Sequence, residues 1–185
     1  MLIPGFLAGA LGAALLRRLP RGATVSPLWC AAPTAVLWFV AWALAPPRWL
    51  PVPLLVAWLG VLLVVTDLRH RRLPDALTLP AYPAVGVALW LCGADLARAL
   101  AGCLLFGGFH LAVHLVKPWA LGGGDVKLAG PLGAVLASVS WSALPAGALL
   151  ASLITLLLST RWPADAVPHA PGLLTATWLA ALWPP

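Results

Sequence analysis

Apolar runs of 14 to 21 residues follow one another along nearly the whole chain, separated by short polar segments. They cover residues 2–16, 28–45, 50–66, 76–92, 96–116, 126–141, 143–160 and 170–183. A helix needs roughly 20 apolar residues to cross a bilayer, and these runs are apolar on every face. The sequence therefore predicts an all-α polytopic integral membrane protein with about eight transmembrane helices.

The charge content excludes several other classes of protein. Hydrophobic side chains make up 62% of the chain and charged ones 9%, whereas an ordinary soluble domain has roughly 25% charged residues. A disordered chain or a basic nucleic-acid-binding domain does not have that balance, so no nucleic-acid partner is expected. The three cysteines stand singly in apolar runs, without the Cys-x-x-Cys spacing of zinc or thiol redox sites.

The positive charges predict the orientation of the chain. No Lys or Arg precedes the run 2–16, whereas Arg17 and Arg18 follow it, which indicates a retained first span with its N-terminus outside. Alternate connections then collect nine of the eleven positive side chains: Arg17, Arg18, Arg21, Arg69, Arg71, Arg72, Lys117, Lys127 and Arg161. Such an excess marks the cytoplasmic side and supports the count of eight spans.

The acids are few, so their places are informative. The chain has five aspartates and no glutamate. Asp95 and Asp165 are interpreted as solvated loop residues. Asp75 follows Pro74 and opens the run 76–92, where its carboxylate is expected to cap the free N–H groups of a helix.

Asp67 ends the run 50–66, at the C-terminus of a predicted helix. The helix macrodipole disfavours a negative charge there by roughly 0.3–1 kcal/mol, so the fold alone does not call for this acid. A structural interpretation also stands, in which the arginines at 69, 71 and 72 neutralise an interfacial carboxylate.

Asp125 directly follows Gly122, Gly123 and Gly124. It is a helix cap after a flexible hinge in the simplest interpretation. Three glycines also remove the side chains that keep a second backbone away, which suits the docking of an extended peptide or another helix. Lys127 does not share a helix face with Asp125, and a lipid headgroup or substrate backbone is its expected contact.

Asp67 and Asp125 are both expected at the cytoplasmic face, on the third and sixth spans. Two carboxylates at close range share one proton, and one acts as base on a water while the other acts as acid. The macrodipoles predict a raised pKa for Asp67 and a lowered pKa for Asp125, which leads to the hypothesis that Asp125 starts as the base. The arginines after Asp67 act in the opposite direction, so the two roles stay open. Such a pair needs no metal or other cofactor.

Two segments together resemble the type 4 prepilin peptidases, membrane aspartic proteases of the GxGD class. They are Asp67-Leu68-Arg69-His70-Arg71-Arg72-Leu73-Pro74-Asp75 and Gly122-Gly123-Gly124-Asp125-Val126-Lys127-Leu128. The resemblance implies that Asp67 and Asp125 are the catalytic pair. It also implies a pilin or pseudopilin precursor as substrate, cut after a short basic leader at the cytoplasmic face of a prokaryotic inner membrane.

The resemblance has two departures. Long members of the family carry a cytoplasmic domain with paired cysteines that is associated with N-methylation, but only residues 22–27 separate the first two runs here. We therefore expect a short form without N-methyltransferase activity, built of a helix pair (1–50) and a six-helix peptidase core (51–185). The second departure is Pro168-His169-Ala170-Pro171, where the family tends to have Pro-Phe-Gly-Pro.

Other interpretations stay open. A small proton- or cation-coupled transporter would use the same acids as ion ligands, and a non-catalytic subunit of a pilus or secretion machine would keep only the fold. His110 and His114 share a helix face, where packing or a hydrogen bond is favoured over a metal site. The run Arg69–Arg72 is expected to bind anionic lipid headgroups. The sequence leaves the oligomeric state open.

Overall fold

The computed structural model describes residues 1–20, 22–71, 73–119, 121–160 and 168–184, which form nine α-helices and one short 3-10 helix. The elements are α1 (Leu2–Arg18), α2 (Leu28–Leu44), η1 (Pro47–Trp49), α3 (Pro51–His70), α4 (Asp75–Thr78), α5 (Ala81–Leu91), α6 (Leu96–Val116), α7 (Gly123–Val139), α8 (Ala143–Ser159) and α9 (Ala170–Ala181). The positions 21, 72, 161 and 165, which the sequence analysis assigned to the loops, lie outside the described residues.

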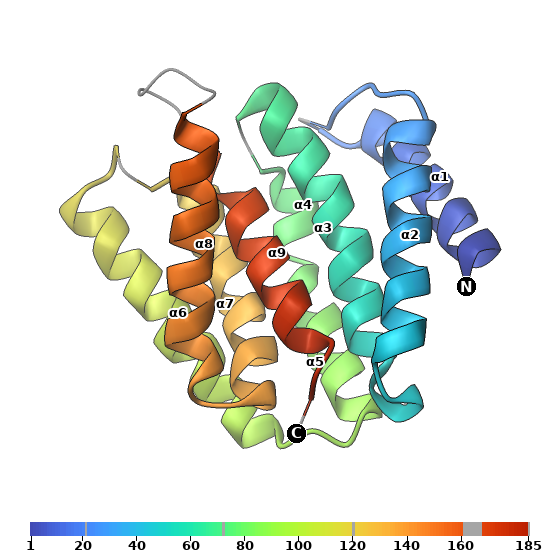
Figure 1. Cartoon of the computed structure of the whole chain (residues 1–185). Coiled ribbons are helices and arrows are strands. Elements are labelled where there is room, and N and C mark those ends of the chain that lie inside the picture. The colour runs from blue at the N-terminus through green and yellow to red at the C-terminus, as the bar shows by residue number, and fades with distance from the viewer. Residues whose placement is uncertain (21, 72, 120, 161–167, 185) are drawn as a thin grey trace.

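The helices lie side by side and alternate in direction, with α4 and α5 together making one crossing of the bundle (Figure 1). In Figure 1, α9 runs toward the bottom of the bundle, whereas α3 finishes at the top. The all-α prediction is confirmed for the described residues, because each predicted apolar run contains a helix.

In the part of the chain that the structure describes, two helices, α3 and α6, are long and apolar enough by length and composition to cross a membrane. The outer helices expose many large apolar side chains. Among the most exposed are Leu104, Leu115, Leu149 and Leu157, each with more than 60% of its surface accessible. Such a surface is costly in water and suits a lipid environment.

The predicted run 76–92 is divided in the structure, because α4 ends at Thr78 and α5 begins at Ala81. Pro80 has no N–H group, so it cannot continue the hydrogen-bond ladder of α4. The ladder resumes when the N–H of Ala84 donates to the carbonyl of Pro80, at 3.1 Å. The short α4 is therefore held as a separate turn next to α7, which it contacts.

Glycines let α6 and α7 lie unusually close together. A methyl group added at Gly133 would lie 2.5 Å from the carbonyl oxygen of Gly102 and closer still to Phe106. Gly5 and Gly9, four residues apart on α1, allow the same close approach to α2. The close contact between α6 and α7 helps to hold α7 in the centre of the bundle, where every residue from Leu128 to Ser138 is buried.

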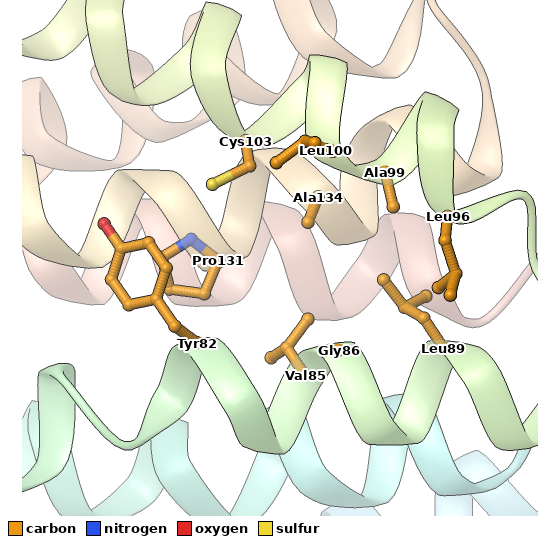
Figure 2. A pocket seen from close by; sticks show the side chains of 10 residues that line it. All are labelled: Tyr82, Val85, Gly86, Leu89, Leu96, Ala99, Leu100, Cys103, Pro131 and Ala134. Atoms are coloured by element: carbon orange, nitrogen blue, oxygen red, sulfur yellow. The ribbon is translucent and has the colours of Figure 1, made fainter.

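An apolar pocket of about 190 Å³ lies between α5, α6 and α7. Figure 2 shows the Tyr82 hydroxyl and the Cys103 thiol near one end of this pocket, and Leu89 and Leu96 near the other. The pocket shares no residue with the cavity described next.

Candidate active site

Asp67 and Asp125 line one cavity of about 300 Å³. Asp67 comes from the last turn of α3 and Asp125 from the first turn of α7. The lining consists of Asp67, Arg71, Leu73, Asp75, Gly122, Gly123, Gly124, Asp125 and Lys127. All the predicted site residues except Pro74 are in this set, and Pro74 stands between two of its members as the residue before α4.

The local fold buries Asp67. The helix α3 continues to His70, four residues beyond the predicted end at 66, so Asp67 belongs to its last turn. Only 6% of the surface of Asp67 is exposed. Arg71 then adopts a left-handed conformation (φ 51°), and its N–H donates to the carbonyl of Asp67 at 2.7 Å. This turn directs the following segment across the end of α3 and toward α7.

One oxygen of Asp67 has no partner. Among the described residues, Oδ2 is buried without a hydrogen bond. An unpaired buried carboxylate oxygen costs free energy unless it carries or shares a proton. The geometry therefore suits a carboxyl group that exchanges a proton with a neighbour inside the cavity.

The start of α7 differs from the sequence prediction. Gly122 is the residue before the helix, and Gly123, Gly124 and Asp125 belong to its first turn, so Asp125 is not the cap. A methyl group added at Gly124 would lie 3.0 Å from Cβ of Leu73. Gly124 therefore lets the segment that follows α3 come close to α7. The sequence analysis expects this role of the three glycines, which is to leave room for a second backbone.

Burial decides the charge of Asp125, which precedes the predicted span 126–141. Desolvation first, and then the nearby charge of Asp67, raise the pKa of its carboxyl group to about 7, although the backbone of Gly122 acts in the opposite direction. The expected lowering by the helix macrodipole is therefore wrong in direction, because desolvation and a like charge outweigh the dipole. Asp125, rather than Asp67, is the better holder of a shared proton near neutral pH.

Asp75 and Lys127 form an ion pair, with Lys127 Nζ donating to Asp75 Oδ1 at 2.7 Å. The predicted cap is wrong, since Pro74 is the residue before α4 and no side-chain cap bond is made there. Lys127 is paired with a carboxylate, and its expected contact with a headgroup or a substrate backbone stays a prediction. A different helix, α6, is capped by Asp95, whose Oδ1 accepts from two N–H groups at its start. The ion pair joins α4 to α7 beside the cavity.

Hydrogen bonds hold the histidines of α6 and the one before α9. His110 is 4% exposed and its Nδ1 lies 2.8 Å from the Phe106 carbonyl oxygen, while Nδ1 of His114 lies 2.7 Å from that of Leu121. These bonds agree with the predicted hydrogen-bonding role. Within the described residues, no group of three His, Cys, Asp or Glu side chains could hold a metal ion. Sequence reasoning missed the bond between His169 and Thr155, because 14 residues separate them without a motif.

Comparisons with known proteins support the family resemblance that the segments 67–75 and 122–128 suggest. Residues 54–160 match the model of the type IV leader peptidase family. The chain is 35% identical over 158 residues to the prepilin leader peptidase/N-methyltransferase of Aeromonas hydrophila, and 31% identical over 165 residues to that of Pseudomonas aeruginosa. Each alignment covers 78% of this chain and 53% of the relative, so the chain spans about half the length of these relatives. No solved structure matches the chain.

Proposed function

This chain belongs to the type IV leader peptidase family, and we propose from that premise that it is a membrane aspartic endopeptidase. Its reaction removes the short basic leader from a type IV prepilin-like precursor, just before the hydrophobic N-terminal helix. The observation that carries the proposal is that Asp67 and Asp125, from two different helices, line one cavity.

The proposed mechanism uses one proton shared by two carboxyl groups. Ionised Asp67 removes a proton from a water, whose oxygen attacks the carbonyl carbon of the leader's last residue. Protonated Asp125 donates its proton to the carbonyl oxygen as the tetrahedral intermediate forms. When the C–N bond breaks, Asp67 gives its proton to the leaving amine, and a hydroxyl group of the intermediate returns a proton to Asp125 as the carboxylic acid forms. The pair then again holds one proton.

The residues around the acids are proposed to place the substrate. Gly122, Gly123 and Gly124 leave the cavity rim without side chains, and a methyl group added at Gly123 would meet no atom within 4 Å. An extended peptide can therefore lie against this backbone. Pro74, Asp75 and Lys127 border the same space, so the ion pair between α4 and α7 is well placed to contact the leader.

We propose that the site faces the cytoplasm, with the N-terminus outside and eight spans across a prokaryotic inner membrane. The run Arg69–Arg72 would then meet anionic headgroups. Arg69 Nη1 donates to the carbonyl of Thr24 at 3.3 Å, which leaves its other donors for lipid, while Arg72 lies outside the described residues. The family match, at 54–160, falls within the proposed peptidase core 51–185.

The proposal is confined to the peptidase reaction. The printed names of the relatives include an N-methyltransferase activity. In this chain only residues 19–27 connect α1 to α2, and the paired cysteines that the resemblance associates with methylation do not occur there.

A gel assay tests the function. The full chain is co-expressed with a prepilin whose basic leader ends in glycine, and leader removal is followed by the change in mobility. Asp67→Asn and Asp125→Asn are each expected to lower cleavage by at least about 1,000-fold, because each removes one member of the pair. Asp95→Asn is the matched control, since Asp95 caps α6 away from the cavity.

Undiminished cleavage by either of the first two variants would contradict the assigned pair. An intact precursor with the wild-type chain would contradict the peptidase function and favour a transporter or a non-catalytic assembly subunit.

A further inference from the structure

Arg48 and Arg98 line one cavity of about 230 Å³, although they come from different elements, η1 and α6. We call it the arginine cavity, and Trp49, Cys92 and Asp95 also line it. It lies where α2 connects to α3 and α5 connects to α6, at the bottom of the bundle in Figure 1. The two arginines are the positive side chains outside the nine that the sequence analysis assigns to the cytoplasmic side.

The two guanidinium groups have no anionic partner. Among the described residues, neither arginine forms an ion pair, and Nε of Arg98 is buried without a hydrogen bond. The lining includes the carboxylate of Asp95, but its Oδ1 accepts from the N–H groups of Ala97 and Arg98, at 2.9 and 3.2 Å. Two positive charges against one negative charge leave the cavity positive. A buried donor without an acceptor costs free energy, so an anion with acceptor oxygens would be stabilised here.

An aromatic side chain lies beside each arginine. Arg98 Cζ lies over the ring of Trp141, 5.4 Å from its centroid. This contact stabilises the cation without a hydrogen bond, so the guanidinium N–H groups stay available to an acceptor. Arg48 is next to Trp49, whose indole N–H donates to the carbonyl of Ala181 at 3.0 Å. That bond joins η1 to the end of α9 and holds the backbone of Arg48 at the cavity.

The apolar pocket between α5, α6 and α7 reaches the same connection. Leu89 and Leu96 line one end of this pocket (Figure 2), and Leu96 directly follows Asp95 of the arginine cavity. Along α6, Leu100 and Leu104 continue the apolar surface, with exposed fractions of 60% and 66%. Arginines at one end and an apolar pocket at the other match the headgroup and acyl chains of a phospholipid.

We propose that the arginine cavity binds the phosphate group of an anionic membrane phospholipid, and the apolar pocket one of its acyl chains. Arg48 and Arg98 donate to the phosphate oxygens, which the planar guanidinium fork matches, and their charges favour an anionic lipid over a zwitterionic one. In the proposed orientation this lipid comes from the outer leaflet. The inference does not depend on the peptidase reaction, because the arginine cavity shares no residue with the cavity of Asp67 and Asp125.

Cys92 reports on the arginine cavity, because its partly exposed thiol belongs to a lining residue. The test uses the full chain with Cys30→Ala and Cys103→Ala in neutral detergent micelles, and measures the rate at which N-ethylmaleimide alkylates Cys92. Dioleoyl phosphatidylglycerol is expected to slow alkylation by about threefold or more. Dioleoyl phosphatidylcholine should have a much smaller effect. Inorganic phosphate, at equal ionic strength, is the third probe and separates a free phosphate from a lipid.

Two sets of variants assign the effect. Arg48→Gln, Arg98→Gln and their combination should remove most of the slowing by phosphatidylglycerol, whereas Arg18→Gln, at the opposite end of the bundle, should keep it. Gly86→Leu places a side chain in the apolar pocket and should weaken the slowing, since a methyl group added there meets no atom within 4 Å. Gly108→Leu is its matched control, because Gly108 is equally open and does not line that pocket.

The unfolding temperature in the same micelles is a second readout. A ligand that binds the folded state raises this temperature, so phosphatidylglycerol should raise it. The combined arginine variant should lose more of the rise than Arg18→Gln does.

Equal slowing by the two lipids, or unchanged slowing in the combined arginine variant, would overturn the inference. Slowing by inorganic phosphate and not by phosphatidylglycerol would overturn the lipid as the source of the phosphate group. Unchanged slowing in Gly86→Leu would overturn the place of the acyl chain. If Cys92 does not react, or Arg98→Gln does not fold, the unfolding temperatures of Arg48→Gln and Arg18→Gln decide, and an equal rise in both overturns the inference.

Discussion

At Asp125, burial affects the pKa of the carboxyl group more strongly than the helix N-terminus does. A carboxylate in the first turn of a helix is normally stabilised by the free N–H groups, and this is the expectation from sequence. The structure places it beside a second acid, and its pKa rises to about 7. The sequence does not show how deeply this carboxyl group is buried, so the direction of its pKa shift could be found only from the structure.

The raised pKa makes the stability of the protein depend on pH. Unfolded Asp125 loses its proton near pH 4, whereas the folded protein keeps it until about pH 7. The folded state therefore binds more protons between these values, and stability falls as pH rises through that window. We expect Asp125→Asn to flatten the fall and to raise the unfolding temperature at pH 8, as measured by thermal scans in micelles. A variant less stable than wild type at pH 8 would contradict this account.

The Lys127–Asp75 ion pair should contribute little to stability, because the two side chains are 45% and 48% exposed. Pairs of this kind contribute about 0.2–1 kcal/mol. Lys127→Met is expected to lower the free energy of unfolding within that range, and Asp75→Asn should add no further loss in the double variant. Lys117→Met provides the control, and denaturant titration in micelles is the measurement. A loss above about 2 kcal/mol would show a larger structural role.

At the scale of helices, the apolar runs predicted the elements well because each helix must be apolar to pack or to face lipid. The errors come from interactions that a run does not encode. Pro80 splits one predicted run, and α7 begins at Gly123, before the predicted start at 126. The hydrogen bond between His169 and Thr155 joins the residue before α9 to α8. The acids were found because charge is scarce, whereas neutral polar contacts gave no comparable signal.

The α6–α7 contact gives a prediction of its own. Gly133→Ala should destabilise the protein by about 1–3 kcal/mol, because the added methyl group meets Phe106 and the Gly102 carbonyl. Gly108→Ala, also in the helix pair, meets no atom within 4 Å and should be neutral or stabilising by up to about 1 kcal/mol. Denaturant titrations of both variants make the comparison, and equal effects would contradict the close packing.

For the whole molecule, the proposed orientation follows from the charges and the alternating helices. In a chain with Cys30, Cys92 and Cys103 replaced, Ser142→Cys should react with a membrane-impermeant maleimide in intact cells. Ser26→Cys should react only after permeabilisation, because it precedes α2 at the other end of the bundle. Both side chains are exposed, so access alone decides the labelling. The reverse pattern would contradict the orientation.

The central claim is that Asp67 and Asp125 act as one unit, and a double-variant kinetic comparison tests it most directly. Rates of leader removal are measured for Asp67→Asn, Asp125→Asn and the combination. Because the two groups share one proton and one reaction, the combined variant is expected to be no slower than the worse single variant, within about threefold. A combined loss equal to the product of the single losses, or full activity in either single variant, would contradict the claim.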